Sequence, residues 1–338
     1  MIKIYIGTIL PNIPYTEILY PILGSREREN PFGEKVFEQK GNPTVEMAEF
    51  PIAADYLCIP HNYNYVKNNK EYIAEFVALS IKYSKKIIIF FPGDSDEEVL
   101  IANSIVFRNS QYRYKKRPNE IIMPAYACDL GKMYGLQYRE KGDKPVVGFC
   151  GWAIYGTSRQ WLSYVVGNVR AFFKPVHKKG LYFRRKALHI LSKSKRLTTR
   201  FVIRSSYSGN SKTLAIDPKA ARIEYVENMK NSDFVLAPKG DGNFSVRFFE
   251  SLSLGRVPLL VDTDCPLPLE DELDYTEFIL KVSYKDMRKL PDIVTNYYVS
   301  LTPEQYAEKQ KKCREAFEKY LKIESFFAHV LDKAFLEK

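Results

Sequence analysis

The sequence predicts an α/β protein made of two doubly wound domains, each with a parallel sheet covered by helices. Three observations predict this class. Short apolar segments alternate with longer segments of helical periodicity, and strands that alternate with helices form parallel sheets. A polar break at residues 140–145 (EKGDKP) divides this series into two. The 338 residues, 45% of them hydrophobic, are enough for two domains with separate cores.

The first series, residues 1–142, is the expected N-terminal domain. Strands are expected where Ile, Leu, Val and aromatic residues form short runs: residues 2–6, 56–59, 87–91 and 121–123. Residues 69–83 carry apolar side chains at intervals of three and four, which predicts a helix. Residues 99–107 fit either a helix or a strand.

The second series, residues 143–302, is the expected C-terminal domain. Strands are expected at residues 145–150, 200–204, 234–237 and 257–261, and helices at 159–173, 183–193, 218–229 and 245–254. Pro218 suits the first turn of its helix. The tail, residues 303–338, shows two further amphipathic helices at 303–321 and 325–336. We expect this tail to pack back on the N-terminal domain.

Charge and cysteine content limit the class of protein. Lys and Arg number 51 against 40 Asp and Glu, a net charge of +11, which suits a nucleic acid, an anionic membrane or a phosphorylated small molecule. The five widely spaced cysteines form no CxxC pair, so neither a disulfide framework nor a zinc site is indicated. With no signal peptide or transmembrane segment in view, a cytoplasmic protein is expected, and peripheral membrane contact stays open.

The segment FVLAPKGDGNFSVRFFESLSLGRVPLLVD, residues 234–262, reads as a strand, a glycine-containing loop, a charged helix and a second strand. Open parallel sheets bind ligands beyond the carboxyl ends of their strands, which is where residues 238–243 fall. Gly240 and Gly242 let the backbone approach a ligand, and the first amides of the helix favour an anion. Asn243 or Ser245 can cap that helix.

Helical spacing places Asn243, Arg247 and Glu250 on one face, since they are four and three residues apart. A guanidinium suits a diphosphate, and a carboxylate can accept hydrogen bonds from both hydroxyls of a ribose. The pattern therefore predicts a nucleotide-diphosphate site. The alternative is an intrahelical ion pair between Arg247 and Glu250.

Residues 225–282 resemble the exostosin-like glycosyltransferases, family GT47. The resemblance rests on the elements Ser-x-Phe-x-Leu-x-Pro-x-Gly, Ser-x-Arg-x-x-Glu and Gly-x-x-Pro followed by an apolar strand and Asp, here SDFVLAPKG, SVRFFE and GRVPLLVD. The segments AADYLCIP and VVGFCGWAIYGTSRQWL, at residues 53–60 and 146–162, are weaker matches to the same family.

The resemblance implies a GT-B fold, in which two Rossmann-like domains face a central cleft. It implies an inverting transfer, usually from a UDP-sugar held by the C-terminal domain to a glycan acceptor held by the N-terminal domain, without a metal or other cofactor. Arg159 and Arg247 would hold the diphosphate and Glu250 the ribose. The full implied donor site is Gly151, Arg159, Lys239, Gly240, Gly242, Asn243, Ser245, Arg247 and Glu250.

The implied chemistry needs two further functions. Charge on the leaving phosphate must be stabilised, a catalytic task for Arg247 and the helix amides. A base must deprotonate the acceptor hydroxyl from the opposite side. We expect that base near strand ends of the N-terminal domain, where Glu17, His61 and Asp94 are the candidates.

Three alternatives remain from the sequence. Asp262-Thr263-Asp264 spells a DxD triplet that could hold a divalent metal beside a diphosphate. The donor could instead be a GDP-sugar used by a transferase of the same fold. Residues 112–117, YRYKKR, interleave aromatic and basic side chains as single-strand nucleic-acid grooves do, so a non-enzymatic basic binding protein is the third reading, although we expect no nucleic-acid partner.

Overall fold

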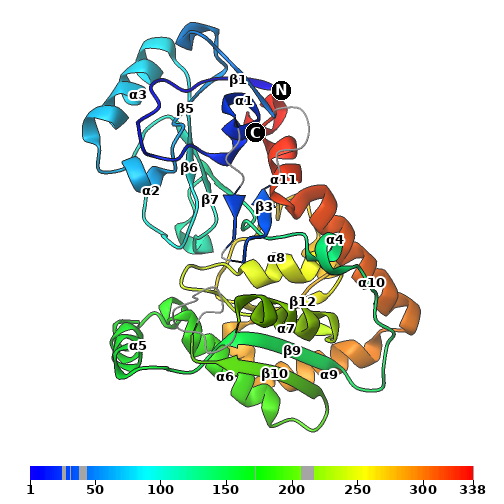
Figure 1. Cartoon of the computed structure of the whole chain (residues 1–338). Helices are drawn as coiled ribbons and strands as arrows, with labels where there is room; N and C mark the ends of the chain where they lie inside the picture. Colours follow the sequence, from blue (N-terminus) through cyan, green and yellow to red (C-terminus); the bar gives the residue numbers. More distant parts are fainter. Residues whose placement is uncertain (25–27, 31, 38–43, 172, 207–216, 338) are drawn as a thin grey trace.

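The computed structural model describes residues 1–24, 28–30, 32–37, 44–171, 173–206 and 217–337. The chain forms two lobes, one above the other in Figure 1, and each contains a parallel sheet with helices packed on it. The predicted α/β class with two doubly wound, Rossmann-like domains is confirmed. None of the helices within these residues has the length and apolarity needed to cross a bilayer.

The N-terminal lobe contains a sheet of order β4-β1-β5-β6-β7-β8 in which every neighbouring pair is parallel. Its strands are β1 (Ile2–Tyr5), β4 (Val45–Met47), β5 (Tyr56–Cys58), β6 (Ile87–Phe91), β7 (Ser104–Arg108) and β8 (Glu120–Ile122). All five residues of β6 are buried because both faces of the sheet are covered. Ile87 and Ile89 face the cluster that contains helix α3 (Lys70–Tyr83), whereas Ile88 and Phe90 face the opposite cluster.

The C-terminal lobe contains a second parallel sheet, of order β10-β9-β11-β12-β13. Its strands are β9 (Val146–Trp152), β10 (Thr198–Arg204), β11 (Phe234–Ala237), β12 (Val257–Asp262) and β13 (Leu280–Ser283). Its helices include α5 (Ser158–Arg170), α6 (Gly180–Ser192), α7 (Pro218–Lys230), α8 (Val246–Ser253) and α9 (Leu290–Ser300). Phe234 and Leu236 join the core with α6 and α8, while Val235 points to α7.

The structure differs from the sequence prediction in its short elements. Residues 99–107, which fit either class, end in strand β7. The strands β4 and β13 and the antiparallel pair of β2 (Arg28–Glu29) and β3 (Lys35–Phe37) were not predicted. These strands are short and contain charged residues, as in RE, KVF, VEM and LKVS, so no apolar run indicates them, whereas β5 and β11 are equally short but apolar throughout.

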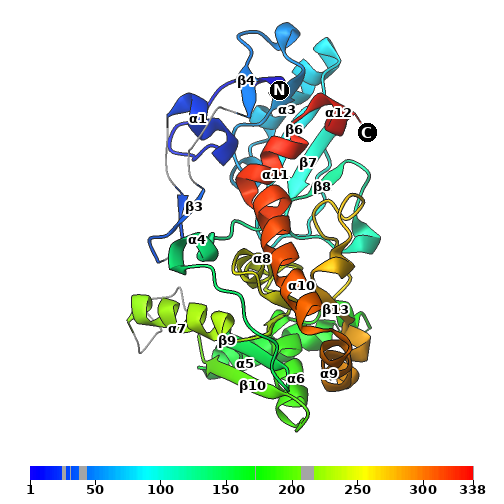
Figure 2. The ribbon, with the colours of Figure 1, turned by 90° about the vertical axis from the view of Figure 1, so that its right-hand side faces the viewer.

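The C-terminal tail joins the two lobes. Helix α10 (Pro303–Ala316) packs on the C-terminal lobe, and the chain then rises to α11 (Ile323–Val330) and α12 (Lys333–Leu336) on the N-terminal lobe (Figure 2). Phe326 and Phe327 are buried in the N-terminal core, where the ring of Phe327 meets Phe90 edge to face at 5.7 Å. The first residue and the last helix also meet, since the amino group of Met1 lies 3.9 Å from Asp332.

The chain crosses between the lobes near residue 124, before the polar break at 140–145. Ala125 and Ala127 already belong to the core of the C-terminal lobe, and Leu130 of helix α4 (Leu130–Tyr134) packs with the cluster around α7. Residues 125–142 therefore line the C-terminal lobe. The polar break is a surface turn of that lobe, which is why its composition indicated a boundary.

Candidate active site

A cleft of about 630 Å³ lies between the lobes, at the carboxyl ends of β9 and β11. Residues from both lobes line it, so it is formed only when the lobes are together. The lining includes Gly151, Trp152, Arg184, Tyr225, Gly240, Ser245, Arg247 and Glu250 from the C-terminal lobe and Phe32, Val36, Asp94 and Tyr126 from the N-terminal part of the chain.

Arg247, in the first turn of α8, has its guanidinium against the end of β9. Nη2 donates to the carbonyl oxygen of Cys150 at 2.7 Å, and the guanidinium lies 4.3 Å from the centre of the Phe149 ring. Gly151 permits this approach because a Cβ atom there would lie 2.8 Å from Arg247 Nη2, and its φ of +151° suits glycine. The Nε of Arg247 is buried without a hydrogen-bond partner among the described residues.

A second arginine, Arg184 of α6, enters the same cleft and was not predicted. Helix α6 begins at Gly180, where a Cβ atom would lie 2.1 Å from the carbonyl oxygen of Gly240, so the helix can pack close to the loop. Among the described residues, Arg184 makes only two long hydrogen bonds, of 3.3 and 3.4 Å, to the carbonyls of Trp152 and Lys239, and its buried Nε has no partner there. Burial, and then the charge of Arg247, lower the pKa of Arg184 to about 10. The two arginines thus form a site of concentrated positive charge.

The sequence contains a signal for Arg184. It lies four residues after Gly180 and three and four residues before the buried Ala187 and Leu188, so it falls on the apolar face of an amphipathic helix. A cation in that position either has a buried partner or faces a ligand.

Glu250 lines the cleft one turn after Arg247, and its carboxylate is held by two other residues. Arg222 donates to Oε1 at 2.8 Å and Tyr225 donates its hydroxyl to Oε2 at 2.6 Å. Arg222 also binds Glu34, from the N-terminal part of the chain, at 2.6 Å. Burial opposes the ionisation of Glu34, but the hydrogen bond and charge of Arg222 outweigh it and lower its pKa. The intrahelical pair considered from the sequence is therefore replaced by a buried Glu34–Arg222–Glu250 network.

The glycine loop faces the N-terminal lobe as well as the cleft. Gly240 lines the cleft, and the backbone N–H of Gly242 donates to Asp94 Oδ1 at 3.0 Å. A Cβ atom at Gly242 would lie 2.7 Å from Asp94 Cα, so this close contact between the lobes requires glycine. Burial is the largest influence on Asp94 and raises its pKa, the charge of Asp241 adds to this, and the bond from Gly242 opposes it.

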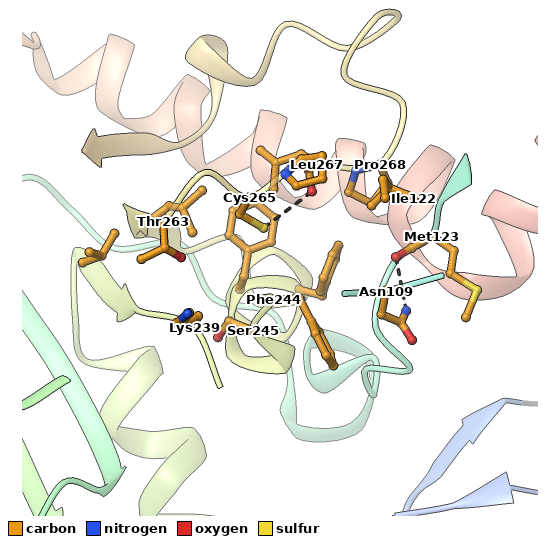
Figure 3. Close-up of a pocket in the computed structure, with 15 residues that line it drawn as sticks. Asn109, Ile122, Met123, Lys239, Phe244, Ser245, Thr263, Cys265, Leu267 and Pro268 are labelled. Atoms are coloured by element: carbon orange, nitrogen blue, oxygen red, sulfur yellow. Dashed lines mark hydrogen bonds between the residues drawn. The ribbon is translucent and has the colours of Figure 1, made fainter. Parts of the chain in front are cut away.

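Two predicted donor-site residues lie elsewhere. Lys239 is 4% exposed and donates to Tyr112 and to the carbonyl of Val176, and burial lowers its pKa to about 8. It borders a separate cavity of about 20 Å³, with Asn109 and Met123 at the other side (Figure 3). Asn243 is 1% exposed and bonds through its backbone N–H to Ser110 at 2.9 Å. Both residues fasten the loop to the N-terminal lobe.

Comparison with known proteins shows a likeness of the C-terminal part of the chain. The family model described as the exostosin GT47 domain matches residues 150–297, from the end of β9 into α9, and so includes the loop, Arg184, Arg247 and Glu250. This part of the chain is therefore similar to the exostosin-like glycosyltransferases.

Several curated proteins are similar to parts of this chain. An exostosin-1 homolog of Caenorhabditis elegans is 30% identical over 111 residues, which are 32% of this chain and 28% of that protein. A probable glycosyltransferase of Arabidopsis thaliana is 34% identical over 97 residues, 28% of this chain and 18% of that protein. The chain thus spans less than a third of the length of these relatives. A glycosyltransferase structure from Rickettsia africae aligns with 84% of this chain and 76% of its own, at 12% identity and a TM-score of 0.38.

Three more predicted site residues do not line the cleft, in addition to Lys239, Gly242 and Asn243. Arg159 is exposed in the first turn of α5. Glu17 is buried and accepts a hydrogen bond from Tyr126, which itself lines the cleft. His61 is fully buried: Leu10 N–H donates to its Nε2 at 2.9 Å, and its Nδ1 lies 3.1 Å from the Pro14 carbonyl oxygen. With both ring nitrogens occupied, His61 belongs to the N-terminal core, and of the three candidate bases only Asp94 lines the cleft.

The DxD triplet lies outside the cleft. Asp262 accepts a hydrogen bond from the backbone of Cys265 and lies 3.5 Å from Lys281. Asp264 accepts, through its side chain, from the backbone of Tyr114 at 3.2 Å. In the part of the chain that the structure describes, no three His, Cys, Asp or Glu side chains gather as metal ligands would.

The YRYKKR segment does not form an open basic groove. Tyr112 is buried under Lys239 and packs on His177, with ring centres 4.3 Å apart. Arg113 pairs with Glu270 at 2.5 Å and Lys115 with Asp96 at 2.6 Å. The segment therefore connects the lobes, and its charges are largely used within the protein.

Proposed function

We propose that the chain transfers a sugar from a nucleoside diphosphate donor, UDP-linked, to a hydroxyl of a glycan acceptor, with inversion at the anomeric carbon and without a metal. The observation that carries this proposal is the pair Arg184 and Arg247. Two guanidiniums line one cleft at the start of a helix, and each has a buried N–H without a partner among the described residues. A diphosphate supplies the missing acceptors and the opposite charge.

The two arginines stabilise the leaving diphosphate most strongly as its bond to the sugar breaks. Negative charge then develops on the phosphate oxygen, and two fixed cations in a partly water-excluded cleft stabilise that charge without reorganising. The N-terminal amides of α8 add further donors. In this proposal the arginines supply the charge that a divalent metal supplies in other transferases.

Asp94 is the proposed base. It lines the cleft from the N-terminal lobe, whereas the two arginines line it from the C-terminal lobe. Inversion requires deprotonation of the acceptor on the face opposite the leaving group. Its raised pKa makes the carboxylate a stronger proton acceptor than an ordinary aspartate.

Glu250 is the proposed ribose ligand. Arg222 and Tyr225 fix its orientation, but each carboxylate oxygen retains capacity for a second hydrogen bond, which the hydroxyls of a ribose can donate. Arg222 and Glu34 act through Glu250 and are positioning residues.

A donor panel tests the proposal. Purified protein is incubated with UDP-sugars and GDP-sugars in EDTA without an acceptor, and release of the nucleoside diphosphate is followed. We expect slow hydrolysis of at least one UDP-sugar, lost in Arg247→Ala, and UDP to protect the protein against heat more than ATP or NAD. Hydrolysis that requires added metal would overturn the metal-independent mechanism, and a preference for GDP-sugars would overturn the UDP-linked donor. Full activity of Arg247→Ala would overturn the role of Arg247.

A further inference from the structure

Helix α5 turns its apolar side chains outward. Trp161, Leu162, Val166 and Val169 are 52%, 56%, 42% and 67% exposed. At 100° per residue these four positions fall on one side of the helix, whereas Gln160 and Tyr164, on the other side, are partly buried. A surface helix of a globular protein normally buries its apolar side. A helix that exposes its apolar side therefore indicates a partner that covers that side.

The helix is held in this orientation by its inner side. The side chain of Thr157 accepts from the backbone of Gln160 at 3.2 Å and so caps the helix. The ring of Tyr164 lies 5.0 Å from that of Tyr155, and the guanidinium of Arg185 lies 4.6 Å from the centre of the Tyr155 ring. Figure 1 shows α5 at the outer end of the C-terminal lobe.

The segment of the sequence that contains α5 carries charge of one sign. Between residues 144 and 216 the sequence has 15 Lys and Arg and no Asp or Glu, whereas the rest of the chain has more carboxylates than cations. This segment supplies β9, α5, α6 and β10. Lys174, Lys179 and Arg185 are exposed, and no carboxylate among the described residues pairs with them. Lys179 lies beside α5, because a Cβ atom at Gly167 would be 3.0 Å from its side chain.

We propose that α5 and the cations beside it bind the surface of an anionic lipid bilayer. The apolar side would enter the headgroup region, as that of an interfacial amphipathic helix does. Lys179 and Arg185 lie on the inner side of the helix, so they would attract the anionic headgroups through longer-range electrostatics, within a Debye length of about 8–10 Å. Two other partners fit less well. Nucleic-acid phosphates offer nothing to Leu162, Val166 and Val169, and a second copy would bring two carboxylate-free basic segments together.

Co-sedimentation with vesicles tests this proposal on the full chain. We expect binding to equimolar phosphatidylcholine–phosphatidylglycerol vesicles, weak binding to pure phosphatidylcholine, and weakening by salt. The double variant Leu162→Ser/Val169→Ser should bind at least about tenfold more weakly, since two aliphatic side chains no longer leave water. Lys179→Gln/Arg185→Gln should lose about fivefold per cation removed.

A matched control removes two exposed aliphatic side chains elsewhere. Ile81 of α3 and Val299 of α9 are 76% and 65% exposed, and Ile81→Ser/Val299→Ser should bind vesicles like the wild type. Unfolding temperature and UDP binding, which we expect to be unchanged in all three variants, show that each is folded. Equal binding to both vesicle types, unchanged binding of the α5 variant, or loss of a dimer in that variant by size-exclusion chromatography would overturn the proposal, as would retention of RNA with the same dependence on α5.

Discussion

Replacement of Arg184 should weaken nucleotide binding without lowering the stability of the free protein. Replacement by Met keeps most of the apolar stem and removes the charge. A charge-assisted hydrogen bond contributes about 1.5–3 kcal/mol, so a loss of about 2 kcal/mol weakens UDP binding roughly 30-fold. The free protein should be no less stable, because the hydrogen bonds of Arg184 to other described residues are long, 3.3 and 3.4 Å, and its charge is opposed by burial and by Arg247.

Ligand-dependent unfolding measures both effects in one experiment. At one hundred times the wild-type dissociation constant, UDP stabilises the wild type by about 2.7 kcal/mol, and a 30-fold weaker variant by roughly 0.9 kcal/mol. The neighbouring Arg185→Met is the control, since Arg185 is exposed and lies against Tyr155 outside the cleft. Wild-type UDP affinity in Arg184→Met, or an unfolding temperature of its free form well below that of the wild type, would refute the reasoning.

Three further predictions concern the base, the buried network and the loop lysine. Asp94→Asn should bind UDP normally but lose about 10²–10⁴-fold in transfer, and the wild-type rate should rise with pH through a pKa above the ordinary 3.8 of aspartate. Arg222→Leu should lower the free energy of unfolding by about 3–5 kcal/mol, because Glu34 and Glu250 are left buried and unpaired. Because the pKa of Glu34 is lower when folded, its contribution is present above its unfolded pKa of about 4.5 and is lost as pH falls, so denaturant melts at pH 7 and pH 4 should differ more for the wild type than for Glu34→Gln. The pKa of Lys239 falls from 10.5 to about 8 on folding. The free energy of unfolding of the wild type should therefore increase as the pH rises from about 8 to 10.5, and this increase should be absent in Lys239→Met.

Each of these predictions has a clear contrary result. Equal loss of UDP binding and transfer in Asp94→Asn would make Asp94 a structural residue of the loop contact. Wild-type stability of Arg222→Leu would mean that water reaches the two glutamates. A Lys239→Met curve parallel to that of the wild type across pH 8 to 10.5 would show that Lys239 is charged in the folded state.

The fold was largely predictable because its longer strands and helices carry their own periodicity. The five apolar residues of β6, which are β-branched or aromatic, favour a strand that is covered on both faces. The loop and Arg247 were predictable for the same local reason, since glycine spacing and helical spacing are read within one segment. The short strands β4 and β13 were missed because Glu46 and Lys281 interrupt their apolar residues, so that neither contains an apolar run.

The rest of the site depends on contacts between distant segments. Arg184 reaches the cleft only because Gly180 packs against Gly240, 60 positions later, and nothing within either segment reveals that contact. His61 follows a strand as a catalytic residue might, yet its ring is occupied by Leu10 and Pro14 from the opposite loop. Burial of a polar residue by a remote segment is what sequence spacing does not show.

The route of the tail has a consequence for the order of folding. Phe326 and Phe327 complete the core of the N-terminal lobe, yet all five strands of the C-terminal sheet lie between them and the first sheet in the sequence. One apolar face of the first sheet therefore stays uncovered until this distant segment reaches it, and contacts between segments so far apart form slowly. The N-terminal lobe, although it comes first in the sequence, cannot complete its core by itself.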